Sequence, residues 1–119
     1  MKNNGFGKKH RLLNSEDYNR VFSNAFKISC KDKFLILTRE NKYLFPRLGI
    51  IAAKKNIKKA VKRNKFKRII RESFRNNKNK LDSLDVIVIA RKGSNYIYKK
   101  ELKEYLDEQW EKLQKHYNI

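Results

Sequence analysis

Two periodicities of apolar residues along the chain predict its secondary structure. Apolar residues spaced three and four apart, as at Tyr18, Val21 and Phe22, indicate amphipathic helices, and short continuous apolar runs indicate buried strands. Ser15 is a suitable N-cap for the first helix. In chain order, the pattern predicts a helix over 15–23, strands over 26–29, 34–38 and 48–53, a helix over 56–77, a strand over 85–90 and a final helix that includes 102–117.

This order of elements indicates the fold class. The run over 85–90 is almost entirely apolar, as expected of a central strand that is buried on both faces. A strand–helix–strand unit over 48–90 predicts an α/β sandwich in which helices pack against a sheet. The 119 residues fit one domain over 1–119, and residues 1–10, which are basic and contain glycine, are expected to be flexible.

Composition narrows the possible partners. The chain carries 31 Lys and Arg against 12 Asp and Glu, a net charge of +19, so a polyanion is the expected partner. Nucleic acid is the first candidate. An anionic membrane is the second, but the sequence contains no amphipathic anchor and no apolar stretch long enough to span a bilayer. No signal peptide is evident, so the cytoplasm is the expected location, and the single cysteine, Cys30, allows no intramolecular disulfide and no zinc cluster.

Most of the charge is concentrated in one segment. Between Lys54 and Lys80 there are 13 cations and one acid, Glu72, so this segment holds +12 of the net +19. The cations are Lys54, Lys55, Lys58, Lys59, Lys62, Arg63, Lys65, Lys67, Arg68, Arg71, Arg75, Lys78 and Lys80. Ordinary solvated helix faces mix acids and bases, so this pattern favours nucleic-acid binding over a solvated face.

A helical wheel divides the segment into two faces. The apolar side comprises Phe66, Ile69, Ile70, Ser73 and Phe74. The opposite side carries Asn64, Arg68, Arg71 and Arg75 at positions i, i+4, i+7 and i+11. This stripe is roughly 16 Å long at about 1.5 Å per residue, enough to reach several phosphates. The planar fork of arginine holds phosphate oxygens in bidentate fashion, so the stripe predicts an RNA-binding surface.

The start of this predicted helix breaks the pattern. Ile57, Ala60 and Val61 fall on the basic side if one straight helix is assumed. Either the first turn is buried beneath another element, or the chain is still turning there. We expect burial of the first turn.

Residues 59–75, KAVKRNKFKRIIRESFR, resemble the signature of the bacterial ribonuclease P protein family, known as the RNR motif. The resemblance extends to the segments 11–22, 47–55 and 85–91 and therefore covers most of the chain. Three positions depart from the family pattern. Lys65 stands in place of the third motif arginine, Lys58 in place of a common glycine, and Tyr18 in place of a usual phenylalanine.

The resemblance implies a fold and a division of labour. The fold would be an αβββαβα sandwich with a left-handed βαβ crossover, like the second domain of a small-subunit ribosomal protein. The partner would be a large catalytic RNA, and the complex would remove the 5′ leader of precursor tRNA. The RNA and its bound Mg²⁺ would perform the chemistry, so no catalytic residue is assigned to the protein and any metal positions on it are unknown.

The resemblance also assigns the binding residues. The catalytic RNA would be bound through Lys54, Lys55, Lys59, Arg63, Asn64, Lys65, Lys67, Arg68, Arg71 and Arg75. Tyr18 and Phe22 would stack on the single-stranded leader. The alternative role for both rings is packing in the core. For Phe22 the residues favour neither role, whereas the hydroxyl of Tyr18 favours an exposed ring.

Two other function classes remain open from the residues. One is a ribosomal or general RNA-binding protein with no part in an enzyme. The other is a self-sufficient metal-dependent nuclease, which would need several converging carboxylates. Asp82 and Asp85 form the one candidate pair, and a loop acid beside a strand-start acid is the simpler interpretation. His10 and His116 lie near opposite ends of the chain.

Overall fold

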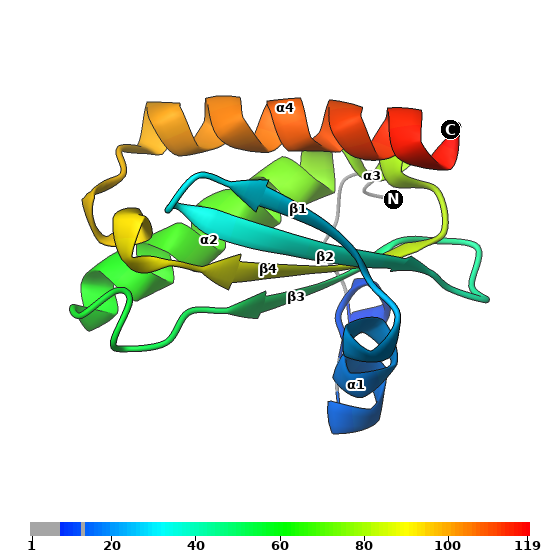
Figure 1. The fold of residues 1–119 in the computed structure, drawn as a ribbon, viewed down its shortest axis with the longest axis horizontal. Coiled ribbons are helices and arrows are strands. Elements are labelled where there is room, and N and C mark those ends of the chain that lie inside the picture. Colours follow the sequence, from blue (N-terminus) through cyan, green and yellow to red (C-terminus); the bar gives the residue numbers. More distant parts are fainter. Residues whose placement is uncertain (1–7, 13) are drawn as a thin grey trace.

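The computed structural model describes residues 8–12 and 14–119. In chain order its elements are η1 (Lys8–His10), α1 (Ser15–Ser23), β1 (Phe26–Cys30), β2 (Phe34–Glu40), β3 (Arg47–Ile51), α2 (Ala60–Asn76), α3 (Lys78–Leu81), β4 (Leu84–Ala90), η2 (Lys92–Tyr96) and α4 (Lys99–Tyr117). The predicted mixed α/β fold, with helices packed against one sheet, is confirmed (Figure 1). Among the described helices, none has the length and apolarity needed to cross a bilayer.

The sheet has the strand order β1-β2-β4-β3. β4 pairs antiparallel with β2 and parallel with β3, and all its residues except Ile89 are buried, so the predicted central strand is confirmed. Parallel neighbours need a crossover connection, and the segment that contains α2 and α3 provides it. The left-handed sense of that crossover stays a prediction.

The alternation of side chains along β4 divides the core into two parts. Val86 and Val88 belong to the main core, which α2 and α4 cover. Ile87 faces the other way and packs with Leu12 and Val21 in a smaller cluster beneath α1. The long helices α2 and α4 thus lie together, while α1 lies apart from them (Figure 1). A single short helix covers only part of its sheet face.

The first helix spans the predicted residues, but its cap differs from the prediction. Asn14, not Ser15, is the N-cap: its backbone is extended, and its Oδ1 accepts a hydrogen bond from the Asp17 N–H at 2.9 Å. Residues 1–7, which we expect to be flexible, lie outside the described residues. His10, in the same predicted flexible segment, is buried, and its Nδ1 lies 3.0 Å from the Pro46 carbonyl oxygen.

The expected buried first turn of the basic helix is wrong. α2 begins at Ala60, after an extended N-cap at Lys59, and the residues before it form a turn in which the Ile57 N–H donates to the Ala53 carbonyl. Ile57 is fully buried from this turn, whereas Val61 is 78% exposed. The chain is therefore still turning at Ile57, and this turn, rather than the helix, puts its side chain into the core.

Candidate nucleic-acid interface

The orientation of α2 is fixed by its apolar face. Its buried residues are the predicted set Phe66, Ile69, Ile70, Ser73 and Phe74. The indole N–H of Trp110, on α4, donates to the Ser73 hydroxyl at 2.8 Å, which ties the two helices together. The core therefore directs the opposite face of α2 to solvent.

That opposite face carries the predicted stripe. Asn64, Arg68 and Arg71 are exposed, and Arg75 is half-buried. Among the residues that the structure describes, no ion pair within 4 Å involves an arginine of α2. The guanidinium groups are thus presented without acidic partners, the arrangement that a phosphate backbone would complement.

The remaining predicted RNA-binding lysines lie just before α2 and along its first half. Lys54, Lys55, Lys59 and Lys65 are exposed, and Lys67 is half-buried. The first turn of α2 has no acidic residue and no side-chain cap. Its positive dipole end and the lysines around it therefore create a strongly positive region that is suited to an anionic ligand.

Arg63 differs from the other predicted contacts. Its Nη1 donates to the carbonyl oxygens of Ile57 and Lys58, both at 3.0 Å, and the residue is half-buried. Arg63 therefore braces the turn that precedes α2. This local role could not be recognised from a helical wheel that assumed a helix from 56.

The two aromatic residues of α1 are exposed in the opposite order to that expected. Phe22 is 43% exposed, whereas Tyr18 is half-buried, so the expected exposure of Tyr18 is wrong. A Cβ at Gly49 would lie 2.6 Å from the Tyr18 hydroxyl oxygen, so only glycine allows this approach. Burial raises the pKa of Tyr18, and its hydroxyl is bonded to the backbone of Ile50. The ring is anchored on β3, and Phe22, 6.3 Å away between centroids, faces outward.

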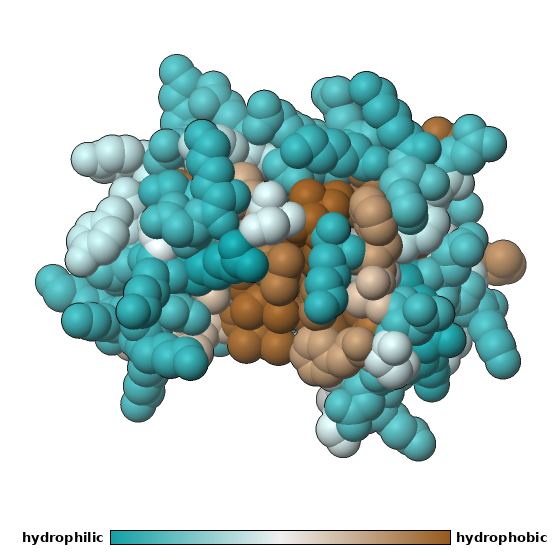
Figure 2. Space-filling model, in the orientation of Figure 1, coloured by the Kyte–Doolittle hydropathy of each residue, from teal (hydrophilic) through white to brown (hydrophobic). Residues whose placement is uncertain are grey.

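The sheet face beside α1 is partly open. Leu35, Ile51 and Ile89 pack on the small core under α1 but remain partly exposed. Figure 2 shows an uncovered hydrophobic area in the middle of this side of the molecule, bordered by hydrophilic side chains. An apolar floor with an exposed phenylalanine beside it is a suitable platform for unpaired bases.

A groove lies between α1, β3 and α2. It is lined by Arg11, Leu12, Tyr18, Leu48, Gly49, Ile50, Lys67 and Arg71. Arg11 was not among the predicted RNA-binding residues, because no local pattern distinguishes it from other basic residues near the N-terminus. The tertiary structure brings it to the groove through the pairing of residue 11 with Leu48.

The carboxylates that could have formed a metal site have other roles. Asp85 is 1% exposed and accepts hydrogen bonds from Nε and Nη2 of Arg47, both at 2.8 Å, and from Asn41 at 2.9 Å. This bidentate pair raises the pKa of Arg47, and Asp17 lies 3.5 Å from the same guanidinium. Asp82 is exposed. The described residues contain no group of three or more His, Cys, Asp or Glu that could hold a metal ion. Because Asp85 is bound by Arg47 and Asn41, the candidate pair of Asp82 and Asp85 does not fit a metal site.

Comparisons with known proteins agree on one family. The profile of the Ribonuclease P family matches residues 6–114. The ribonuclease P protein component of Saccharophagus degradans is 46% identical over 110 residues, which are 92% of this chain and 82% of the relative. The Aliivibrio fischeri protein of the same name is 45% identical over 111 residues, or 93% and 94% of the two chains.

Solved structures give the same result. The RNase P protein of Staphylococcus aureus superposes with a TM-score of 0.77 at 32% identity, over 83% of this chain and 90% of that one. The RNase P protein of Thermotoga maritima superposes with a TM-score of 0.73 at 32% identity, over 86% and 96%.

Proposed function

Because this chain belongs to the ribonuclease P protein family, and is therefore a component of a tRNA-processing enzyme complex, we propose that its basic helix α2 binds the catalytic RNA of ribonuclease P. The observation that carries the proposal is the exposed, acid-free stripe of Asn64, Arg68 and Arg71. The lysines around the start of α2 would extend this surface. Arg63 would support it indirectly, by bracing the turn.

We propose that the second RNA surface binds the 5′ leader of precursor tRNA. It consists of the exposed Phe22 ring and the open sheet face with Leu35, Ile51 and Ile89. Tyr18 would position α1 against β3 rather than act as the outermost stacking ring. The groove that Arg11, Lys67 and Arg71 line supports a shared function for the two surfaces, since it lies between Tyr18 of α1 and Arg71 of the α2 stripe.

In this proposal the RNA carries the catalysis and binds the Mg²⁺ ions that act with it. The protein contributes electrostatics: it can hold two polyanions close together because its cations offset their mutual repulsion. The buried carboxylates Asp85 and Asp17 stabilise Arg47 instead of a metal ion. A cytoplasmic location stays a prediction.

A cleavage assay with three arms tests the proposed function. Precursor tRNA is incubated with the protein alone, with a bacterial ribonuclease P RNA alone, and with both, at low Mg²⁺. We expect cleavage at the leader junction to be fastest with both components and absent with nuclease-treated protein alone. Robust cleavage by the protein alone would assign catalysis to the protein. If the protein bound many RNAs equally but never accelerated cleavage, it would be a general RNA-binding protein.

A further inference from the structure

A pocket lies between the beginnings of α2 and α4, and of its lining residues only Lys65 belongs to the RNA surfaces described above. It is lined by Lys62, Lys65, Phe66, Ile69, Ser94, Asn95, Tyr96, Ile97, Tyr98, Lys99 and Leu102. Its volume is about 370 Å³, within the roughly 300–1,000 Å³ range of small-molecule sites. The pocket is therefore large enough to receive one nucleobase.

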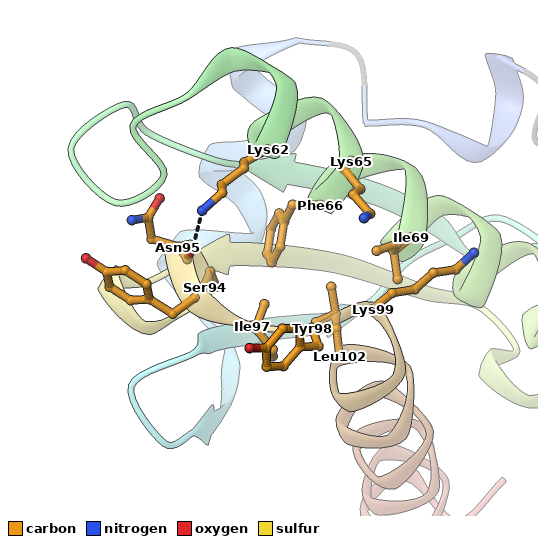
Figure 3. Close-up of a pocket in the computed structure, with 11 residues that line it drawn as sticks. Lys62, Lys65, Phe66, Ile69, Ser94, Asn95, Ile97, Tyr98, Lys99 and Leu102 are labelled. Carbon is orange, nitrogen blue, oxygen red and sulfur yellow. Dashed lines mark hydrogen bonds between the residues drawn. The ribbon is translucent and has the colours of Figure 1, made fainter.

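The floor of this pocket is apolar. Phe66 and Ile69 of α2 and Leu102 of α4 are nearly fully buried at its base. Figure 3 shows these three side chains pointing toward the space between the two helices. An apolar floor favours an aromatic or apolar group over a hydrated ion.

Two tyrosines stand at its edge. Tyr96 is 75% exposed and Tyr98 is 80% exposed, so two large aromatic rings close together in the sequence are both open to solvent. The ammonium of Lys62 lies 5.9 Å from the Tyr96 ring centroid and donates to the Asn95 carbonyl at 3.1 Å. The tyrosine rings can stack on any base, because every base presents a π face.

The charge of the rim identifies the chemical class of the occupant. Lys62, Lys65 and Lys99 line the pocket, and none of its lining residues is acidic. An apolar side chain of a partner protein could fill the floor, but it would leave these cations unmatched. A nucleotide matches both parts, since its base is aromatic and its phosphate is anionic.

We propose that this pocket binds an unpaired nucleotide of the same catalytic RNA that the exposed stripe of α2 binds. This inference rests on the proposed function. The catalytic RNA is favoured over the leader because Lys62 and Lys65 lie on α2, the helix that also carries the proposed RNA-binding stripe. The groove between α1 and α2, on the side of the leader platform, is lined instead by Lys67 from the other flank of α2.

The binding test uses the full chain and a bacterial ribonuclease P RNA at fixed salt. One stacked base contributes about 1–3 kcal/mol, roughly 5-fold to 150-fold in affinity. The double variant Tyr96→Ala/Tyr98→Ala should therefore bind the catalytic RNA at least about fivefold more weakly. Tyr96→Phe/Tyr98→Phe keeps both rings and should bind like the unchanged protein. Tyr43→Ala, at a tyrosine that is 44% exposed and far in sequence from the pocket, is the matched control and should also bind normally.

Cross-linking locates the contact. Catalytic RNA substituted with 4-thiouridine is irradiated in complex with the protein, which is then digested with trypsin. Cleavage after Lys92 and Lys99 places both tyrosines in the single peptide 93–99, whereas Tyr18 and Phe22 fall in peptides 12–20 and 21–27. We expect the catalytic RNA to label 93–99, and a thiouridine-labelled leader to label 12–20 or 21–27.

Several results would overturn the proposal. These are unchanged affinity of the double alanine variant, no label on 93–99, label there from the leader only, or a dimer in sedimentation that the double alanine variant abolishes. None of them affects the proposed function if Arg68→Ala still weakens binding to the catalytic RNA. If neither Arg68→Ala nor the double alanine variant changes binding, the proposed function fails and this inference fails with it.

Discussion

Phe22 offers the sharpest test of the leader platform, because its ring can be removed without dismantling the core. A fully buried phenylalanine costs about 3–5 kcal/mol when it is replaced by alanine. The Phe22 side chain is 43% exposed, so we expect Phe22→Ala to lower the free energy of unfolding by only about 1–2 kcal/mol. The variant should therefore stay folded and can be assayed for binding.

The expected effect on RNA binding follows from stacking. If one leader base rests on the ring, Phe22→Ala should weaken binding of precursor tRNA to the holoenzyme by about 1–3 kcal/mol. Binding of mature tRNA, which has no leader, should hardly change. Phe22→Ala should not affect binding of the protein to the catalytic RNA. Arg68→Ala should weaken that binding, whether the substrate is precursor or mature tRNA.

A leucine variant separates stacking from packing. Phe22→Leu keeps an apolar side chain on α1 but removes the aromatic face, and Asn19→Ala, an exposed position on the same helix, controls for changes in α1 itself. The assay is the ratio of dissociation constants for precursor and mature tRNA, measured with the holoenzyme at fixed salt and Mg²⁺. We expect Phe22→Leu to lose most of the discrimination between precursor and mature tRNA that Phe22→Ala loses. Asn19→Ala should keep this discrimination.

One outcome would refute this reasoning directly. If folded Phe22→Ala discriminated precursor from mature tRNA as well as the unchanged protein does, the ring would have no leader-binding role. If Phe22→Leu restored full discrimination, the side chain would act through apolar contact rather than through stacking.

Three further predictions concern charge. If about 6–10 phosphates are engaged, affinity for the catalytic RNA should fall roughly 10³–10⁵-fold between 50 and 200 mM salt, and a flat salt titration would contradict phosphate binding. Asp85→Asn should lower the free energy of unfolding by about 3–5 kcal/mol in urea titrations, because it leaves the Arg47 charge buried with its main partner lost; exposed Asp82→Asn, which removes the same charge, should have little effect. Burial lowers the pKa of His10, so the imidazole of the unfolded chain takes up a proton at a higher pH than that of the folded protein. The free energy of unfolding should therefore decrease as the pH falls below about 6.5. In His10→Gln this decrease should be smaller, and an identical pH profile would exclude His10 as its cause.

The two faces of α2 could be predicted because a regular helix makes its periodicity visible in the sequence. Spacing alone identified the five buried residues and the outward stripe with Arg68 and Arg71. β4 was predictable for a related reason, since a strand buried on both faces must be almost continuously apolar. The concentration of charge likewise needed no coordinates.

The residue at which α2 begins depends on tertiary contacts. Ile57 is an apolar residue in a basic run, and the spacing places it on the wrong face of a straight helix. Its burial depends on a turn that Ala53 and Arg63 stabilise through backbone carbonyls, and backbone hydrogen bonds of this kind leave no periodic trace in the sequence.

Residues that are distant in sequence decided the rest. Tyr18 is anchored because Gly49, on another element, leaves room for its hydroxyl, and this leaves Phe22 as the outward ring of the pair. Asp85 is unavailable to a metal because Arg47 stands beside it across the β3–β4 pairing. The sequence by itself thus determined which segments are apolar, basic or aromatic. Only the packing of elements decided which of their side chains are buried, paired or exposed, because those contacts join residues that no local pattern connects.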